Sequence, residues 1–272
     1  MSFDRARAFE EMLRIAVGAA ARVRERYEGE LDVAYKGVDD PVTALDREAN
    51  ELITSALAAL FPEVPIVAEE SAAATWEARA GARRAFFVDP LDGTKELIAR
   101  NGEFAVMIGL AEDGAASAGV VACPASGRVF AGVVGAGAFE RTLDAGSARR
   151  RISVADVEPA RGRALVSRSR PDPRTNATLA RAGFATIEPM GGAGLKAALV
   201  AAGEAQLYAH LAPAGKLWDA CASEAILRAA GGVLTCGRGR PIDYRGRLEL
   251  ADGVLAGAPI AHRSVLAATL AE

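Results

Sequence analysis

The stretch AFFVDPLDGTKEL, residues 85–97, decides how the rest of the sequence is interpreted. Its aromatic and β-branched start favours a strand, and Pro90, which has no N–H to donate, is expected to end that strand. A helix is predicted to begin at Thr94, and its free N–H groups would attract an anion. Asp89 and Asp92 would share one tight turn, where two carboxylates repel each other unless a divalent cation lies between them.

The same acids also have a purely structural interpretation. Asp89 could be a turn residue and Asp92 a helix cap, because Asp-Gly is common in both roles. Asp46 lies three residues after Thr43 and could serve only a helix N-terminus. Asp219 could do no more than complement a helix dipole. No single acid decides between a site and a cap.

Composition narrows the class of protein. The chain has 272 residues, 51% of them hydrophobic and 25% charged, which is enough apolar material for a large core. A net charge of -3 argues against nucleic acid or an anionic membrane as the main partner. Its three cysteines show no C-x-x-C spacing, so neither a disulfide framework nor a zinc site is expected. We expect a cytoplasmic protein with no membrane span.

Hydrophobic periodicity predicts two parts. Helices are expected over 3–27 and 43–60, and a short strand that ends in acids over 66–71. Three strands, at 104–110, 117–123 and 129–134, predict an antiparallel meander. Later residues alternate between strand and helix patterns, which predicts an α/β layer with a mixed sheet. We expect an N-terminal α+β domain at 1–145 and a C-terminal α/β domain at 146–272.

Several separated motifs combine into a family resemblance. The segments AEES at 68–71, DPLDGT at 89–94 and WDACA at 218–222 resemble the inositol monophosphatase superfamily of magnesium-dependent, lithium-sensitive phosphatases. The resemblance covers nearly the whole chain in the family's order and spacing. The segments DGTKE, GEF and GGAGLK, at 92–96, 102–104 and 191–196, look like its 3'(2'),5'-bisphosphate nucleotidase branch. Inositol monophosphatases usually have Thr-Asn-Phe after Asp-Gly-Thr.

The resemblance implies a fold and a metal site. The fold would be the layered α/β sugar-phosphatase fold, with α-β-α-β-α layers, an antiparallel N-terminal sheet and a smaller mixed C-terminal sheet. Two or three Mg²⁺ ions are implied, with Li⁺ as an inhibitor. The implied metal ligands are Glu69, Asp89, the carbonyl of Leu91, Asp92 and Asp219. Because Asp219 belongs to the predicted second domain, closure of the cleft is expected to depend on metal.

The resemblance also assigns catalytic residues. Glu69 and Thr94 would orient the attacking water and assist its deprotonation, without a covalent enzyme intermediate. Asp46 would accept the hydrogen bond of the Thr94 hydroxyl. Lys36 is expected near a metal-bound water or the phosphate.

Substrate contacts are expected from both predicted domains. They are Gly93, Thr94, Ser167, Arg170, Gly192, Lys196 and Asp219. Arg170 replaces a histidine of the nucleotidase pattern, and could stack on the base or pair with a second phosphate. Gly194 is a second departure, because many bacterial members have serine there. For Arg170 and Lys196, plain solvent exposure is the alternative.

The expected reaction is hydrolysis of the 3'-phosphate of adenosine 3',5'-bisphosphate to AMP and phosphate. The substrate would be a small phosphorylated nucleotide, and 3'-phosphoadenosine 5'-phosphosulfate is a second expected substrate. Two alternatives stay open: an inositol-1-monophosphatase, and a non-catalytic regulatory protein that binds metal and phosphate. The sequence carries no signal for the oligomeric state or the number of resident ions.

Overall fold

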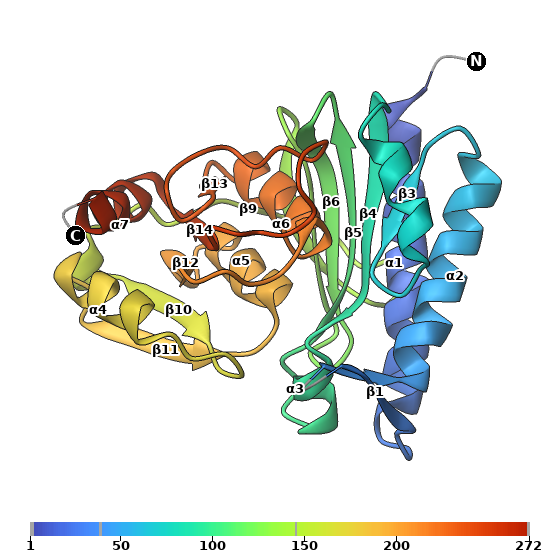
Figure 1. The fold of residues 1–272 in the computed structure, drawn as a ribbon, viewed down its shortest axis with the longest axis horizontal. Helices are drawn as coiled ribbons and strands as arrows, with labels where there is room; N and C mark the ends of the chain where they lie inside the picture. The colour runs from blue at the N-terminus through green and yellow to red at the C-terminus, as the bar shows by residue number, and fades with distance from the viewer. Residues whose placement is uncertain (1–2, 38–39, 145, 271–272) are drawn as a thin grey trace.

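The protein is built of five layers, which alternate between helices and sheets (Figure 1). The computed structural model describes residues 3–37, 40–144 and 146–270. The layers run from a helix pair through the larger sheet, a second helix pair and the smaller sheet to a third helix pair. The predicted α-β-α-β-α architecture is therefore confirmed.

The larger sheet has seven strands and carries the opening motif. Helices α1 (Arg5–Tyr27) and α2 (Ala44–Leu60) cover its outer face. Its strands, in spatial order, are β3 (Ile66–Ala68), β4 (Arg84–Asp92), β5 (Ala105–Glu112), β6 (Ala115–Cys123), β7 (Arg128–Val133), β8 (Gly137–Thr142) and β9 (Arg150–Ile152). Only the β3–β4 pair of this sheet is parallel. The predicted meander is confirmed, whereas β8 and β9 were missed.

The prediction that Pro90 ends its strand is wrong. Strand β4 runs on to Asp92, with a register shift between Asp89, opposite Met107, and Asp92, opposite Ala105. The missing N–H of Pro90 thus falls in a bulge, where the ladder is interrupted in any case. In a regular strand, residues three apart point to opposite faces. The extra residue of the bulge lets Asp89 and Asp92 meet on one side.

Short elements connect and flank the strands. A hairpin of β1 (Val33–Gly37) and β2 (Asp40–Thr43) precedes α2, and α3 (Thr94–Ile98) follows β4. The polar residues at 37–41 predict a turn, and residues 38 and 39 of this segment lie outside the described residues. The 3₁₀ turns are Ala73–Thr75, Glu77–Arg79 and Pro159–Arg161.

The second half adds a mixed five-stranded sheet, as predicted. Its strands, in spatial order, are β11 (Thr186–Met190), β10 (Arg163–Ser167), β12 (Leu207–His210), β14 (Val254–Gly257) and β13 (Val233–Thr235). β10 pairs in parallel with β11 and β12, while β14 pairs antiparallel with its neighbours. Helices α5 (Ala193–Ala201) and α6 (Leu217–Ala229) form the middle layer, and α4 (Pro173–Arg181) and α7 (Pro259–Leu270) the outer one.

Helix α6 packs directly on the larger sheet. A Cβ at Gly109 of β5 would lie 2.6 Å from the backbone nitrogen of Ala222, and one at Gly119 of β6 would overlap the carbonyl oxygen of Ala222. The helix backbone therefore touches the sheet backbone with no side chain between them. This packing holds the first turn of α6, and Asp219 with it, against the larger sheet. The expectation that closure of the cleft depends on metal stays a prediction.

The division of the chain at residue 145 stays a prediction. Strand β9 lies beyond that point yet pairs with β8 in the larger sheet. Cores on both sides of α6 join in one cluster that includes Phe87 of β4, Leu199 of α5 and Trp218 of α6.

Gly119→Ala should lower Tm by roughly 5 °C, because an added methyl group pushes α6 off the sheet and such overpacking costs about 1–3 kcal/mol. Thermal unfolding followed by circular dichroism measures the change. Gly18→Ala is the matched control. Gly18 lies exposed in α1 and has no atom within 4 Å of an added Cβ, so alanine there should leave Tm unchanged or raise it. Equal Tm values for Gly119→Ala and the wild type would contradict the close approach.

Candidate metal and phosphate site

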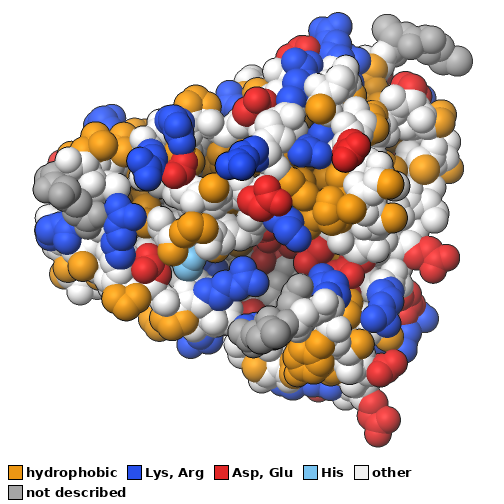
Figure 2. Space-filling model, viewed as in Figure 1, with side chains coloured by type: hydrophobic (Ala, Val, Ile, Leu, Met, Phe, Trp, Pro, Cys, Tyr) orange, Lys and Arg blue, Asp and Glu red, His pale blue; other side chains and the backbone are white. Residues whose placement is uncertain are grey.

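Three carboxylates meet in the cleft between the two sheets. Asp89 and Asp92 come from the end of β4 and Asp219 from the first turn of α6. Each offers a carboxylate oxygen, and these oxygens lie within 4.8 Å of one another. Figure 2 shows acidic side chains in the hollow on this face of the molecule. The cleft has a volume of about 150 Å³ and is also lined by Glu69 and Thr94.

Burial, and for Asp89 and Asp219 also the charge of neighbouring acids, raises the pKa of these carboxyl groups. Burial raises the pKa of Asp89 well above its ordinary value, and the charges of Glu69 and Asp92 add to this. Burial also raises the pKa of Asp92. Burial and the charge of Glu69 raise the pKa of Asp219 to about 7. Buried carboxylates that repel one another are the donor set that a hard divalent cation binds, so the residues fit the implied metal.

Glu69 lies beside this cluster but pairs with a cation of the chain. It follows β3, whose parallel pairing with β4 brings the two carboxyl ends together, and its N–H donates to the carbonyl of Val88 at 3.1 Å. Its carboxylate accepts a hydrogen bond from Nζ of Lys36 at 2.9 Å, and Glu70 accepts another at 2.5 Å. Burial lowers the pKa of Lys36, but the charge of Glu69 and both hydrogen bonds raise it above its ordinary value.

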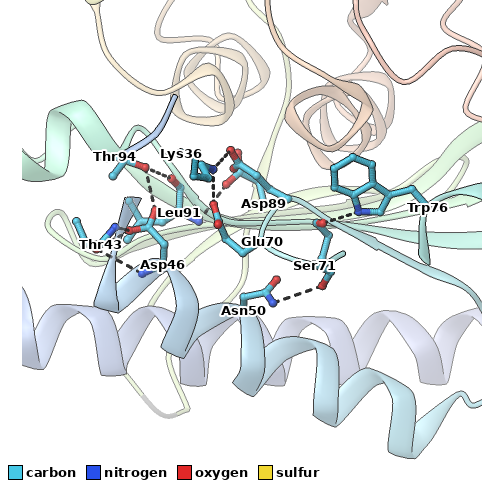
Figure 3. A network of polar contacts seen from close by, with 12 residues as sticks. Lys36, Thr43, Asp46, Asn50, Glu70, Ser71, Trp76, Asp89, Leu91 and Thr94 are labelled. Carbon is cyan, nitrogen blue, oxygen red and sulfur yellow. Dashed lines mark hydrogen bonds and ion pairs between the residues drawn. The ribbon is translucent and has the colours of Figure 1, made fainter. Parts of the chain in front are cut away.

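Glu70, to which the sequence interpretation gave no role, shares the ammonium group of Lys36 with Glu69. Figure 3 shows the hydrogen bond that Lys36 donates to the Glu70 carboxylate. The sequence held a signal for this contact, because two adjacent acids at a strand end repel each other and a nearby cation offsets that repulsion. The structure supplies Lys36 for this purpose.

Asp46 serves two structures at once. Its Oδ2 accepts hydrogen bonds from the backbone N–H of Thr43 at 2.7 Å and from the Thr43 hydroxyl at 2.5 Å, which completes a capping box at the start of α2. Its Oδ1 accepts the hydrogen bond of the Thr94 hydroxyl at 2.9 Å (Figure 3). The Thr94–Asp46 hydrogen bond expected from the resemblance is present. Asp46 therefore caps α2 and also binds Thr94, while its catalytic role stays a prediction.

Gly93 and Leu91 complete the turn between β4 and α3. Gly93 has φ 98°, in the left-handed region, and a Cβ there would lie 3.1 Å from the carbonyl oxygen of Glu103. The carbonyl oxygen of Leu91 lies 3.4 Å from the hydroxyl oxygen of Thr94. All of these residues except Glu103 line the cleft. Anion binding by the N–H groups of Gly93 and Thr94 stays a prediction.

Asp92 also holds the loop that faces it. Its two carboxylate oxygens accept the backbone N–H groups of Ala193 at 3.0 Å and Gly194 at 2.6 Å, at the start of α5. A Cβ at Gly194 would overlap the sulfur of Met107 and lie 3.2 Å from Oδ2 of Asp92. The departure from serine at this position therefore has a steric reason in this chain.

The substrate residues expected in the second half lie along the same cleft. Ser167, Arg170, Gly192 and Lys196 all line it. The hydroxyl of Ser167 accepts the backbone N–H of Arg170 at 3.1 Å, which leaves the exposed Arg170 side chain at the cleft wall. Their contacts with a substrate stay predictions.

Lys196 is buried rather than solvent-exposed. Its side chain is 2% exposed, and Nζ donates to the carbonyl oxygens of Met190 and Gly191 at 3.1 Å and of Gly192 at 2.7 Å. Burial lowers its pKa to about 8, although the charge of Asp92 opposes this. The exposed alternative is wrong for Lys196. No pattern in the amino-acid sequence indicated that its ammonium group binds the carbonyl groups of the neighbouring loop.

One family of known proteins matches almost all of this sequence. The profile of the inositol monophosphatase family matches residues 7–272. The chain belongs to this family. The cluster of Asp89, Asp92 and Asp219 is therefore a candidate metal site within a family fold, and the recognised superfamily is confirmed.

Individual relatives point to the nucleotidase branch. The chain is 35% identical to the 3'(2'),5'-bisphosphate nucleotidase CysQ of Escherichia coli (strain K12) over 240 residues, 88% of this chain and 94% of that protein. The crystal structure of CysQ from Bacteroides thetaiotaomicron is 29% identical, with a TM-score of 0.77, and covers 93% of this chain and 97% of that one. An IMPase/NADP phosphatase complexed with Mg²⁺ and phosphate, 18% identical with a TM-score of 0.81, shows the shared fold over 99% of this chain and 97% of that one.

Asp219→Asn should stabilise the metal-free protein at high pH. A carboxyl whose pKa rises on folding, here from 3.8 to about 7, holds its proton more tightly in the folded state. Stability is therefore lost as pH rises through this window. In the presence of EDTA, the variant should melt roughly 3 °C above the wild type at pH 8, with the gain shrinking toward pH 4.

The matched control is Asp252→Asn, because Asp252 pairs with Arg238 and Arg240 outside the cleft and its pKa is lowered by these bonds against the effect of burial. This control should gain nothing at pH 8. Added Mg²⁺ should raise Tm of the wild type at pH 8 and raise that of Asp219→Asn far less. A pH-independent Tm difference between Asp219→Asn and the wild type would contradict the repulsion among the acids.

Proposed function

We propose that this protein hydrolyses the 3'-phosphate of adenosine 3',5'-bisphosphate to AMP and phosphate. The observation that carries the proposal is the cluster of Asp89, Asp92 and Asp219 beside the Thr94–Asp46 hydrogen bond. The identity of 35% with a 3'(2'),5'-bisphosphate nucleotidase over 88% of the chain supports the substrate. The 5'-phosphosulfate analogue of this nucleotide is a second proposed substrate.

The resident metal is proposed to be Mg²⁺, as two or three ions held by Glu69, Asp89, Asp92, Asp219 and the carbonyl of Leu91. Bound there, the ions would lower the pKa of a water molecule and offset charge on the phosphate and the leaving oxygen. Oxygen-only donors suit this hard cation. Inhibition by Li⁺ belongs to the same proposal, on the strength of the family resemblance.

Thr94 and Asp46 orient the attacking water. The Thr94 hydroxyl has one proton, and Asp46 accepts it at 2.9 Å. The lone pairs of Thr94 are then left to accept a hydrogen bond from a water molecule in the cleft. That bond would turn a lone pair of the water toward phosphorus, while Glu69 accepts the proton that the water loses. The bond from phosphorus to the 3'-oxygen breaks as the new bond forms, the leaving 3'-oxygen takes up a proton from solvent water, and no enzyme group is phosphorylated.

The opposite wall of the cleft is proposed to bind the nucleoside and its second phosphate. Arg170 lies exposed on this wall, where its guanidinium can pair with a phosphate or stack on a base. The backbone of Gly192 and the neighbouring Ser167 complete the wall. A cation at this place favours a substrate with two anionic groups over inositol monophosphate, which has one.

The setting is proposed to be cytoplasmic. Cys123, Cys221 and Cys236 are free thiols, and the first two are buried. Such thiols suit a reducing compartment. Among residues 3–37, 40–144 and 146–270, no helix combines the length and apolar character that crossing a membrane requires.

With Mg²⁺, the purified protein should release phosphate from adenosine 3',5'-bisphosphate with a kcat/KM at least about 100-fold above that for inositol 1-phosphate, a discrimination of roughly 3 kcal/mol. Colorimetric phosphate release measures both. Asp89→Asn should abolish turnover while the fold is kept, because the amide oxygen can still accept the 3.0 Å hydrogen bond from the N–H of Leu91. A preference for inositol 1-phosphate would contradict the proposed nucleotidase activity and support an inositol monophosphatase activity. Metal-dependent melting without turnover of either substrate would favour the non-catalytic binder.

Asp46→Asn should lower kcat about 100-fold and leave KM nearly unchanged, because the amide cannot accept the Thr94 proton and both Thr43 bonds together. Steady-state phosphate release measures the two constants. Thr43→Ala is the control: it weakens the same helix cap but keeps the Thr94–Asp46 bond, so it should lower Tm without lowering kcat more than about threefold. Equal losses of kcat in both variants would assign Asp46 to the cap alone.

A further inference from the structure

One carboxylate joins three segments that are far apart in the sequence. Glu103 lies between α3 and β5, on the same side of the cleft as the metal-binding turn. Its carboxylate accepts both ends of the Arg168 guanidinium, from Nε at 2.9 Å and from Nη2 at 2.7 Å. The same Oε2 accepts the backbone N–H of Gly191 at 2.6 Å. We call this set of contacts the Glu103 clasp.

The two segments held by the clasp form the far wall of the cleft. Arg168 is flanked by Ser167 and Ser169, which line the cleft, and Gly191 directly precedes Gly192, which lines it too. The backbone N–H of Arg168 donates to the carbonyl of Met190 at 3.0 Å, so the two segments also touch each other. A shift of Glu103 would move both.

The clasp leaves little freedom to the loop at 190–192. A Cβ at Gly191 would overlap Cγ of Glu96 and lie 3.0 Å from Cβ of Glu103, so the backbone is pressed against the metal side of the cleft. Lys196 binds the three carbonyls of this loop, and Asp92 the two N–H groups that follow it. Neither Lys196 nor Asp92 binds the N–H of Gly191. This N–H donates to the carboxylate of Glu103 instead.

Two observations separate the clasp from an ordinary surface ion pair. The Glu103 side chain is only 18% exposed, and the pairing is a two-pronged Arg–carboxylate contact, which is the stronger geometry. Burial alone would raise the pKa of Glu103, but the Arg168 hydrogen bond and the Gly191 N–H lower it below its ordinary value. Glu103 is thus held as an anion in both contacts.

We propose that Glu103 is a positioning residue, whose clasp on Arg168 and Gly191 sets the distance between the metal-binding turn and the wall that receives the nucleoside end of the substrate. This inference rests on the proposed nucleotidase function. Within the described chain, the hydrogen bonds of the Glu103 carboxylate run to Arg168 and Gly191, neither of which is a proposed metal ligand. Glu103 acts on the part of the substrate away from the reaction.

The test compares two substrates and two variants. Glu103→Gln and Arg168→Ala should each raise KM for adenosine 3',5'-bisphosphate about tenfold, the effect of one lost charged hydrogen bond, with kcat within about threefold of the wild type. Turnover of 4-nitrophenyl phosphate, which carries no nucleoside, should stay within about twofold. The double variant should be no worse than the poorer single variant, because both changes open the same clasp. Arg168→Lys, which keeps the charge but not the fork, should recover part of the loss.

Hydrogen exchange gives a readout that needs no substrate. Amides of residues 167–170 and 190–192 should exchange faster in Glu103→Gln, while Tm changes by less than about 3 °C. Asp252→Asn is the control, since it opens an arginine pair outside the cleft and should change neither exchange at these residues nor KM.

The outcomes distinguish a failure of the proposed nucleotidase function from a failure of the proposed role of Glu103. If the wild type does not turn over the nucleotide, the proposed function fails, and the exchange data still decide whether Glu103 holds the two segments. Unchanged exchange in Glu103→Gln overturns the clasp. Faster exchange with an unchanged KM for a nucleotide that the wild type does hydrolyse overturns its role in positioning the substrate.

Discussion

The close approach of helix α6 to the larger sheet is the constraint on which the site depends. Gly109 and Gly119 let the helix backbone rest on β5 and β6, and Asp219 in its first turn then lies opposite the end of β4. A bulge in β4 brings Asp89 and Asp92 to the same place. Three acids are thereby forced together by packing, and their mutual repulsion is the cost of presenting a strong cation site.

The surroundings of the acids limit this repulsion in different ways. Asp92 has two backbone N–H groups of α5, and Glu69 has the ammonium group of Lys36. Asp89 accepts only the N–H of Leu91 among the hydrogen bonds found in the described chain, and its pKa is raised well above its ordinary value. The backbone N–H groups that bind Asp92 belong to the start of α5 in the cleft wall. The charge state of Asp92 and the position of this wall therefore depend on each other.

The residues of the acidic cluster were easier to predict from the sequence than the hydrogen bonds that hold the loops around it. Asp89, Asp92 and Asp219 could be named because motif residues keep their order in the sequence, and the Thr94–Asp46 bond followed from the resemblance. Strand β4 was ended too early, because a proline inside a bulge looks the same in sequence as a proline that ends a strand. The partners of Lys196 and Glu103 could not be foreseen, because tertiary packing brings the loop at 190–192 to both residues and the Arg168 side chain to Glu103.

The contact between Gly194 and Met107 has a consequence for sequence change within the family. Gly194 lies in the first turn of α5, whereas Met107 is a buried residue of β5 in the larger sheet. A chain that acquires a side chain at position 194 needs a smaller or displaced residue at position 107, since both compete for one volume. The two positions should therefore vary together, so that a substitution in the first turn of α5 requires a second one in the core of the larger sheet.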